Sequence, residues 1–287
     1  MRKAPAPIGL EELRQRATIA RGMLRSCTLC EKRCGVDRIA GERAPCGLND
    51  QTWCFKRHIS FAEELELLPS YMVYFGGCNF RCKFCVQAPK CFDPALGTQV
   101  DASAAAADFR RITERGAKTI NLLGGEPTLH LHTILEIAAE AAERDPARPL
   151  PLLINSNMYM SPEVIDLLDG VAAFYIADFK FGCDACARDL AGIDRYVEVV
   201  TRNLMHAAAS SEVLVRHLVM PGHIDCCLRP VARWVAERMP EAAFTLMTGY
   251  VPAYRAGACA GLDRVLTREE CERAEGIVRE HGLRRAA

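Results

Sequence analysis

The sequence lacks a long hydrophobic run and an excess of either charge, and each absence argues against a class of protein. No apolar stretch reaches the about 18 residues that suggest a membrane-spanning helix. The 36 basic residues equal the 36 acidic residues, so global charge predicts neither nucleic-acid binding nor a polybasic membrane anchor. Residues 1–7 lack the apolar core of a signal peptide. We therefore expect a cytoplasmic protein that binds neither nucleic acid nor membrane.

Cysteine, in contrast, is abundant, with 15 among 287 residues. In a reducing compartment, metal binding or catalysis accounts for so many cysteines better than disulfides do. The densest group is Cys78, Cys82 and Cys85, a C-x3-C-x2-C run at the end of the apolar residues 71–75. Three thiolates on one short loop can hold three irons of a [4Fe–4S] cluster. Because such a cluster normally takes four thiolates, the spacing leaves one iron open to another ligand.

Two alternative interpretations of this group fit its sequence less well. Zinc in structural sites prefers four closed ligands, usually from two separated pairs, and this compact group has no obvious fourth partner. Free cysteine is also a common core residue, so the three could be packed thiols. The polar residues Asn79, Arg81 and Lys83 between them favour a loop over a core segment.

A second group of four cysteines, with the pattern C-x2-C-x3-C-x11-C, consists of Cys27, Cys30, Cys34 and Cys46. Four thiolates at this spacing can close a tetrahedral zinc site or bind a [4Fe–4S] cluster through thiolates alone. The sequence does not choose between these metals, and four unligated cysteines are a third alternative. We favour the iron–sulfur cluster, which would also offer an electron route. Cys54 can replace one member of the group.

From about residue 70 the chain alternates short apolar runs with helical patterns, which predicts βαβ units and a parallel sheet in an α/β fold. Six such units suggest a partial (βα)6 barrel at 70–255. An N-terminal extension at 1–69 contains a helix around 10–24 and a cysteine-rich, metal-binding segment. A C-terminal helix at 256–287 is expected to pack on the barrel. The predicted strands are residues 71–75, 119–123, 151–155, 172–178, 213–219 and 244–248.

Several helix ends are recognisable from their capping residues. Asp101 can cap an alanine-rich helix that stops at Gly116. Pro162 stands at the first position of another helix, where its missing N–H costs nothing. Thr267 and Glu270 have the spacing of a capping box and predict the start of the last helix.

Polar groups follow the predicted strands, and in βα barrels the working groups lie at the carboxyl ends of strands. The cysteine loop follows the first strand, and Gly124-Gly125-Glu126 follows the second. The glycines let the backbone approach a ligand closely, and the carboxylate can accept a hydrogen bond from an ammonium group. Asn155 and Asn157, after the third strand, can hydrogen-bond a ribose. Each segment is alternatively an ordinary polar turn.

Charged residues mark the fourth and fifth predicted strands. Asp178 and Lys180 lie on the same face because side chains alternate along a strand, so a carboxylate and an ammonium can share one site. Arg216 lies inside an otherwise apolar strand, where an unpaired charge is costly to bury. It can contact a carboxylate or a ribose. A simple ion pair at the strand end is the alternative for the first two residues.

The segment Gly77-Cys78-x3-Cys82-x-Phe84-Cys85 resembles the signature of the radical S-adenosylmethionine (SAM) superfamily. The resemblance implies a [4Fe–4S] cluster on the three cysteines and a partial barrel. It also implies that the amino and carboxylate groups of SAM's methionine part chelate the open iron. Gly124-Gly125-Glu126-Pro127 resembles the motif that binds the methionyl amino group, and Asp178-x-Lys180 resembles an element of the glycyl-radical activases that lies near SAM.

The resemblance covers about residues 25–255 and points to the PflX-like branch, which is related to the pyruvate formate-lyase activating enzymes. Two runs carry the branch assignment, one at 216–222 (R-H-L-V-x-P-G) and one at 246–252 (L-M-x-x-Y-x-P). A cysteine set similar to the N-terminal group also precedes the barrel in that branch.

The reaction that the resemblance implies begins when a flavodoxin- or ferredoxin-type donor reduces the cluster. SAM is then cleaved reductively, and a 5′-deoxyadenosyl radical abstracts hydrogen from a substrate. An activating enzyme would take a glycine of a partner protein as substrate. Alternatively, the substrate is a small molecule or peptide held by cysteines at the rim of the barrel. A metal-binding interaction module without turnover is a further alternative, which would make the SAM motifs coincidental.

Six further cysteines follow strands and are expected at the active-site rim: Cys91, Cys183, Cys186, Cys226, Cys227 and Cys259. They can bind another cluster, hold a soft substrate or donate a hydrogen atom, or they are small buried thiols without such a role. Cys183-x2-Cys186 lies directly after the Asp178-x-Lys180 element and is the best catalytic candidate among them. Tyr250 is a further catalytic candidate.

Overall fold

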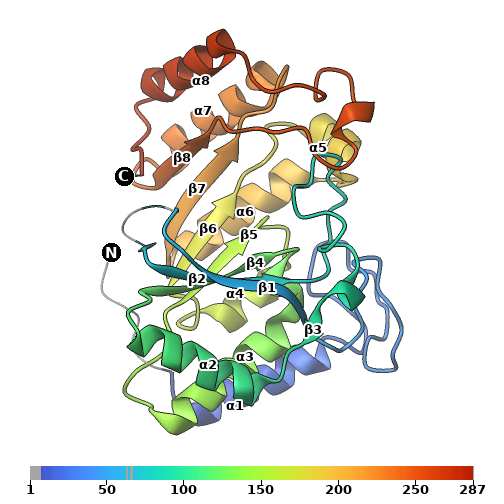
Figure 1. Cartoon of the computed structure of the whole chain (residues 1–287), viewed down its shortest axis with the longest axis vertical. Coiled ribbons are helices and arrows are strands. Elements are labelled where there is room, and N and C mark those ends of the chain that lie inside the picture. The colour runs from blue at the N-terminus through green and yellow to red at the C-terminus, as the bar shows by residue number, and fades with distance from the viewer. Residues whose placement is uncertain (1–7, 63, 65–66, 287) are drawn as a thin grey trace.

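A sheet of eight strands forms the centre of the protein in a computed structural model that describes residues 8–62, 64 and 67–286 (Figure 1). Six strands are parallel. The first and last residues of each lie within two residues of the ends that the sequence predicted, which confirms the predicted α/β fold. Residues 1–7, which the signal-peptide expectation concerns, lie outside the described part. The parallel strands are β2 Ser70–Phe75, β4 Thr119–Gly124, β5 Leu152–Ser156, β6 Phe174–Asp178, β7 Glu212–Leu218 and β8 Ala243–Met247.

Two antiparallel strands extend the sheet beyond β2. β1, Trp53–Ser60, pairs with β2, and β3, Thr98–Gln99, pairs with β1. The strand order is β3-β1-β2-β4-β5-β6-β7-β8, so the described strands form an open, partial barrel. β1 is not among the strands that the sequence predicts, because Lys56 and Arg57 interrupt its apolar pattern. Near the edge of a sheet such exposed charges are tolerated, since they discourage pairing with other chains.

Helices cover the outside of the curved sheet (Figure 1). α1 packs against α3, which also packs against α2, whereas α8 packs against α7 at the other end of the molecule. The bounds are α1 Leu10–Gly22, α2 Ala102–Glu114, α3 Leu131–Arg144, α4 Pro162–Leu168, α5 Asp184–Ala191, α6 Tyr196–Ala208, α7 Arg229–Arg238 and α8 Arg268–Glu280. Short turns are the 3₁₀ segments η2 Pro94–Leu96, η3 Pro127–His130 and η5 Ala256–Ala258 and the π-helical turn η4 Ile224–Leu228.

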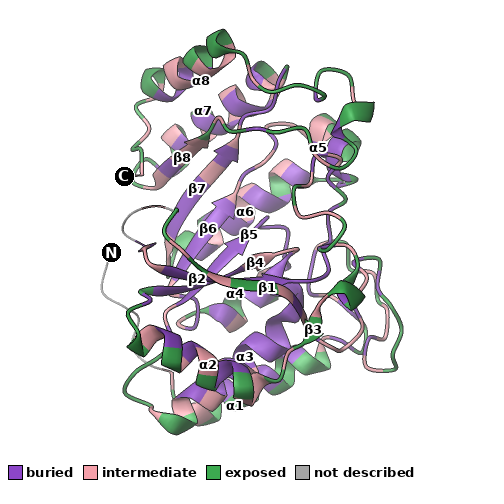
Figure 2. Cartoon of the chain, viewed as in Figure 1, coloured by how far each residue is buried: buried purple, intermediate pink, exposed green. Residues whose placement is uncertain are grey.

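The core lies along the parallel strands, which Figure 2 shows as mostly buried. Every residue of β2 and β5 is buried. Strands of a parallel sheet are covered on both faces, which is why they read as continuous apolar runs in the sequence. That continuity explains why the sequence located these strands well. No helix of the described residues is long and apolar enough to cross a membrane.

The predicted helix caps are present. The Asp101 carboxylate accepts a hydrogen bond from the Ala104 amide at 2.8 Å and begins α2. Pro162 occupies the first position of α4. Thr267 and Glu270 form a complete capping box at the start of α8, with distances of 3.2 and 2.9 Å. Such caps satisfy amides that the helix itself leaves unpaired, and each stabilises its helix by about 1 kcal/mol.

Candidate functional site

The carboxyl ends of the parallel strands surround a cavity of about 250 Å³. Cys78, Cys82 and Cys85 line it from the loop that follows β2. Seven of the eight predicted cofactor-binding residues line it as well, and they come from the ends of four further strands. These seven are Gly124, Gly125, Asn155, Asn157, Asp178, Lys180 and Arg216. The structure therefore brings the two predicted groups of residues to one place.

The cysteine loop is held on two sides by backbone hydrogen bonds. On one side, the amide of Cys78 donates to the carbonyl oxygen of Cys46 at 3.3 Å. On the other side, the amides of Arg81 and Lys83 donate to the last carbonyl groups of α5 at 3.0 and 2.8 Å. Gly77 has a φ of +79°, which favours glycine and turns the chain into the loop. These contacts place the thiols before any cofactor binds.

Burial and a neighbouring thiol shift the pKa values of these three cysteines. Burial raises the pKa of Cys78 and raises that of Cys82 to about 12, although the Lys180 ammonium opposes the shift at Cys82. At Cys85 the Cys91 thiol lies 3.4 Å away, and its hydrogen bond to the sulfur lowers the pKa of Cys85. Iron or zinc binds thiolates, so metal binding at this loop must displace protons.

The arrangement fits a [4Fe–4S] cluster with one open iron. Three thiols face a common cavity from one loop, and polar groups of other strands line the rest of the cavity. The three sulfurs do not all lie within 4.8 Å of one another, the spacing at which side chains share a single ion. A multi-iron cluster needs the wider spacing because its irons and sulfides lie between the thiolates.

Glu126 is the predicted cofactor residue that does not line the cavity. Its carboxylate is fully buried and accepts hydrogen bonds from the hydroxyl groups of Thr128 at 2.7 Å and Ser156 at 2.8 Å. The amide of Asn157 donates to the other carboxylate oxygen at 2.9 Å. Burial raises the pKa of Glu126, although these hydrogen bonds oppose the shift. The side chain thus ties the end of β4 to the end of β5.

The two glycines before Glu126 allow β4 to end against the cysteine loop. A Cβ atom on Gly125 would lie 1.9 Å from the carbonyl oxygen of Gly77. Gly124 has a φ of +111°, and a Cβ atom there would lie 2.6 Å from the amide nitrogen of Phe75. No other residue fits these positions without moving the backbone, so the motif forms a cradle that depends on glycine.

Asp178, Lys180 and Arg216 form an ion-pair network beside the cavity. The carboxylate of Asp178 accepts from Lys180 Nζ at 2.6 Å and from Arg216 Nε at 2.9 Å. Arg216 Nη2 also donates to Asn155 Oδ1 at 3.0 Å. Burial raises the pKa of Asp178, but the two cations outweigh it and hold that pKa well below its ordinary value. The network thus places the cationic groups of Lys180 and Arg216 at the cavity, where they suit an anionic ligand group.

A fully buried arginine, Arg38, lies beside two of the N-terminal cysteines, Cys27 and Cys46, and no pattern in the sequence singles it out. Arg38 Nη1 lies 4.0 Å from the sulfur of Cys27, and Nη2 has no hydrogen-bond partner among the described residues. Burial raises the pKa of Cys46, and the largest opposing influence is the charge of Arg38. Burial also raises the pKa of Cys30 to about 12. A buried cation with an unpaired N–H fits an anionic, thiolate-ligated metal group. No periodicity of the sequence indicates this role.

The other predicted residues are spread over several places. Cys54 lies in β1, where Arg57 Nε donates to its sulfur at 3.4 Å. Tyr250 is buried, and its hydroxyl donates to the carbonyl oxygen of Leu262 at 2.8 Å. Cys259 contacts the carbonyl oxygen of Arg255 at 3.7 Å. All six rim cysteines belong to the described residues, and of these only Cys91 lines the cavity. The other five, Cys183, Cys186, Cys226, Cys227 and Cys259, do not line it.

Comparisons with known proteins place these features in context. The sequence model of the radical SAM superfamily matches residues 72–235. An uncharacterized protein of Methanocaldococcus jannaschii is 32% identical over 270 residues, which are 92% of this chain and 78% of the relative.

Two solved structures have a similar fold. SuiB of Streptococcus suis, bound to S-adenosylmethionine, superposes with a TM-score of 0.52 and 12% identity over 71% of this chain and 45% of that chain. The native anSMEcpe with bound AdoMet gives a TM-score of 0.53 and 13% identity over 74% of this chain and 60% of that chain. This chain thus spans less than two thirds of either protein, and the likeness concerns the fold.

Proposed function

The chain belongs to the radical SAM superfamily of enzymes, which use a [4Fe–4S] cluster and SAM, and we propose that it is an activating-enzyme-like member. The observation that carries the proposal is the single cavity, which three cysteines and seven predicted cofactor residues line together. The open sheet supports it further, because a barrel that does not close between β3 and β8 can admit a loop of a partner protein. We propose further that the chain belongs to the PflX-like branch of the superfamily.

Cys78, Cys82 and Cys85 would hold the cluster, and the ends of the other strands would hold SAM. When bound, the cluster supplies one electron, and SAM supplies the 5′-deoxyadenosyl group that takes a hydrogen atom from the substrate. The cationic groups of Lys180 and Arg216, which Asp178 holds at the cavity, would attract the methionyl carboxylate and orient it.

The remaining predicted residues would position SAM. The backbone of Gly124 and Gly125 faces the cavity and can contact the methionyl amino group, while the Glu126 carboxylate fixes the motif from behind. The amides of Asn155 and Asn157 reach the same cavity and can hydrogen-bond the ribose. In this assignment Glu126 acts through the backbone that it anchors.

We also propose that Cys27, Cys30, Cys34 and Cys46 bind a second [4Fe–4S] cluster rather than zinc. The buried Arg38 supports a thiolate-ligated group there, because its charge offsets part of the negative charge of the ligands. The hydrogen bond from Cys78 to Cys46 joins the two loops. The second cluster would pass electrons inward from a flavodoxin- or ferredoxin-type donor in the cytoplasm.

The alternative substrate is a small molecule or a peptide. SuiB has also been solved bound to the precursor peptide SuiA, and that structure superposes with a TM-score of 0.50 and 13% identity, over 73% of this chain and 45% of that chain. Rim cysteines that hold such a substrate would be expected to line the cavity. Cys91 does so, but it contacts Cys85, and the best rim candidate, Cys186, lies outside the cavity. This favours a partner-protein glycine as substrate.

An anaerobic assay tests the proposal. The protein is reconstituted with iron and sulfide, supplied with SAM and dithionite, and assayed for 5′-deoxyadenosine. We expect product from the parent and from Cys271→Ala, a control in α8, and none from Cys82→Ala. Equal product from the parent and Cys82→Ala, or none from either, would contradict the enzyme assignment. A glycyl radical on a co-expressed partner, seen by electron paramagnetic resonance, would then distinguish an activating enzyme from the alternative.

A further inference from the structure

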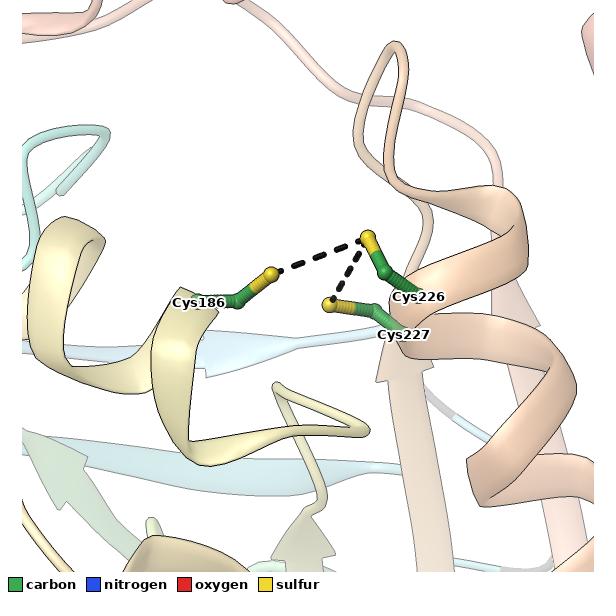
Figure 3. Close-up of side chains that lie close together, drawn as sticks. All are labelled: Cys186, Cys226 and Cys227. Atoms are coloured by element: carbon green, nitrogen blue, oxygen red, sulfur yellow. Dashed lines mark hydrogen bonds between the residues drawn. The ribbon is translucent and has the colours of Figure 1, made fainter.

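Three rim cysteines that the proposed reaction does not use converge on one point (Figure 3). Cys186 extends from α5, and Cys226 and Cys227 extend from η4. The sulfur of Cys186 lies 3.6 Å from that of Cys226, which lies 3.9 Å from that of Cys227. Within the described part of the chain, this is the one group of three or more histidine, cysteine or acidic residues whose ligand atoms all lie within 4.8 Å.

The backbone is built to bring these sulfurs together. A Cβ atom on Gly182 would lie 2.4 Å from the carbonyl oxygen of Cys227 and 2.8 Å from that of Cys226. The loop before α5 therefore rests directly on η4, at a distance that only glycine allows. A π-helical turn is rare and is often found at functional sites. Here it directs two consecutive cysteines toward α5, as Figure 3 shows.

The sulfur spacing matches the geometry of a single tetrahedral metal ion. Zinc–thiolate bonds are about 2.3 Å long, and the edge of a tetrahedron of that size is about 3.8 Å. The sulfur–sulfur distances of 3.6 and 3.9 Å lie on either side of this value. A disulfide would need a sulfur–sulfur distance of about 2.05 Å, and all these cysteines are free. The trio thus has the spacing of ligands around one ion.

A fourth thiol lies next to this group. Cys183 is the N-cap residue of α5, three residues before Cys186, and its thiol is near enough to raise the pKa of Cys186. Its sulfur does not lie within 4.8 Å of all three others, so Cys183 would turn toward the ion to become the fourth ligand. The C-x2-C spacing is the one that zinc sites commonly use for a ligand pair. Cys183 and Cys186 form one pair and Cys226 and Cys227 the other, which corresponds to the two separated pairs of a structural zinc site.

We propose that Cys183, Cys186, Cys226 and Cys227 bind one zinc ion, in a structural site separate from the two iron–sulfur sites. Each thiol releases its proton to solvent as it becomes a ligand, and no electron is transferred. Because four thiolates close the tetrahedron, the ion has no open position for a substrate.

The zinc site would stabilise the position of α5, the helix that supports the cysteine loop. α5 begins at the proposed zinc ligands, and its last carbonyl groups, at Leu190 and Ala191, accept the hydrogen bonds from Lys83 and Arg81. Zinc would join the start of α5 to the turn that follows β7. The four cysteines are therefore positioning residues, which act on the loop through α5.

Metal analysis of the full-length, cluster-loaded protein tests the proposal. We expect about one zinc per chain, with an X-ray absorption spectrum that shows about four sulfur neighbours at about 2.3 Å. Cys186→Ser and Cys226→Ser should each lose that zinc and keep the iron, whereas Cys271→Ser should keep both metals. Absence of zinc from the parent, equal zinc in the variants, or an iron shell around the sulfurs would overturn the proposal. The parent spectrum needs no variant, so poor folding of a variant does not weaken the test.

Two further measurements test the fourth ligand and the positioning role. In Cys183→Ser the sulfur count should fall from about four to about three, and an unchanged count would exclude Cys183 as a ligand. Removing zinc from the parent with a chelator should increase hydrogen exchange in 184–191 and in the cysteine loop, and leave β5 unchanged. Unchanged exchange in 184–191 would contradict the positioning role.

Discussion

Gly125 lies so close to Gly77 that a single added carbon atom would collide with the carbonyl oxygen of Gly77 at 1.9 Å. This contact joins the end of β4 to the start of the cysteine loop. The amide of Glu126 donates to the same oxygen at 2.9 Å. The SAM motif and the cluster loop are therefore one backbone unit, and a change in one must displace the other.

Gly125→Ala should accordingly separate the two loops. We expect it to lower the free energy of unfolding by about 1–3 kcal/mol, the usual cost of overpacking, and to reduce the iron retained by the protein. Gly276→Ala in α8 is the matched control, because a Cβ atom there meets only the end of Arg279 at 3.9 Å. That control should be stabilising by about 0.5–1 kcal/mol. Urea unfolding and iron analysis measure both effects, and a parent-like Gly125→Ala would show that the close contact is not required.

Asp178→Asn should damage both stability and SAM binding. Without the carboxylate, Lys180 and Arg216 remain as neighbouring, partly buried cations, so the cost should approach the about 3–5 kcal/mol of breaking a buried ion pair. Adding Lys180→Met in the same chain should restore much of the stability, because it removes one of the two neighbouring like charges.

SAM binding separates the structural role of this network from its proposed ligand role. Equilibrium binding to the cluster-loaded protein should be weakened at least about tenfold, or about 1.4 kcal/mol, in the double variant, even where its stability recovers. Parent-like affinity in the stable double variant would show that the network does not contact SAM.

Arg38→Met should remove the second cluster and spare the first. Methionine keeps much of the volume of arginine but not the charge that faces Cys27 and Cys46. Iron should fall from about eight to about four atoms per chain, because each cubane holds four. Arg25→Met, an exposed change in the same segment, is the control. An unchanged iron content in Arg38→Met would contradict the role of Arg38.

The buried histidines predict a loss of stability in acid. Burial lowers the pKa of His130 and His132 to about 3 and that of His217 to about 4. These folded pKa values lie below the unfolded value of about 6.5, so the contribution is fully present above pH 6.5 and is lost as pH falls toward 3–4. Each histidine can reduce the free energy of unfolding by up to about 1.4 kcal/mol per pH unit in that range.

Urea unfolding between about pH 7.5 and about pH 5.5, about one unit above and below the unfolded value, measures this slope. His132→Gln keeps an amide that can donate to the carbonyl oxygen of Asp50, as the ring nitrogen does at 3.0 Å. The variant should have a shallower pH dependence than the parent, since one proton uptake is removed. An identical slope in parent and variant would show that His132 is not neutral in the folded protein.

The sequence predicted the six parallel strands because their residues are buried on both faces and form continuous apolar runs. It also predicted the cavity, since parallel strands bring their carboxyl ends to one edge and residues such as Asp178 and Lys180 alternate onto one face. It did not predict β1, whose charged residues are typical of a strand near a sheet edge. Nor did it predict the orientation of the Glu126 carboxylate, which depends on hydroxyl and amide donors of β5 and η3.

Tertiary contacts explain what the sequence could not show about the cysteines. Cys183 and Cys186 have a recognisable metal-binding spacing, but Cys226 lies 40 residues after Cys186, and Cys227 follows it. Adjacent side chains of a regular α-helix do not face each other, and here a π-helical turn directs both cysteines toward α5. The role of Arg38 likewise depends on which loops surround it, and no local pattern records that.

The central claim is that SAM binds the open iron of the cluster held by Cys78, Cys82 and Cys85. Electron–nuclear double resonance of the reduced cluster tests it most directly, with SAM that carries magnetic isotopes at its methionyl carboxylate and amino group. We predict couplings of both labels to the cluster in the parent and in Cys271→Ala, and their loss in Cys82→Ala. A reduced cluster that shows no coupling to either label in the presence of saturating SAM would contradict the account.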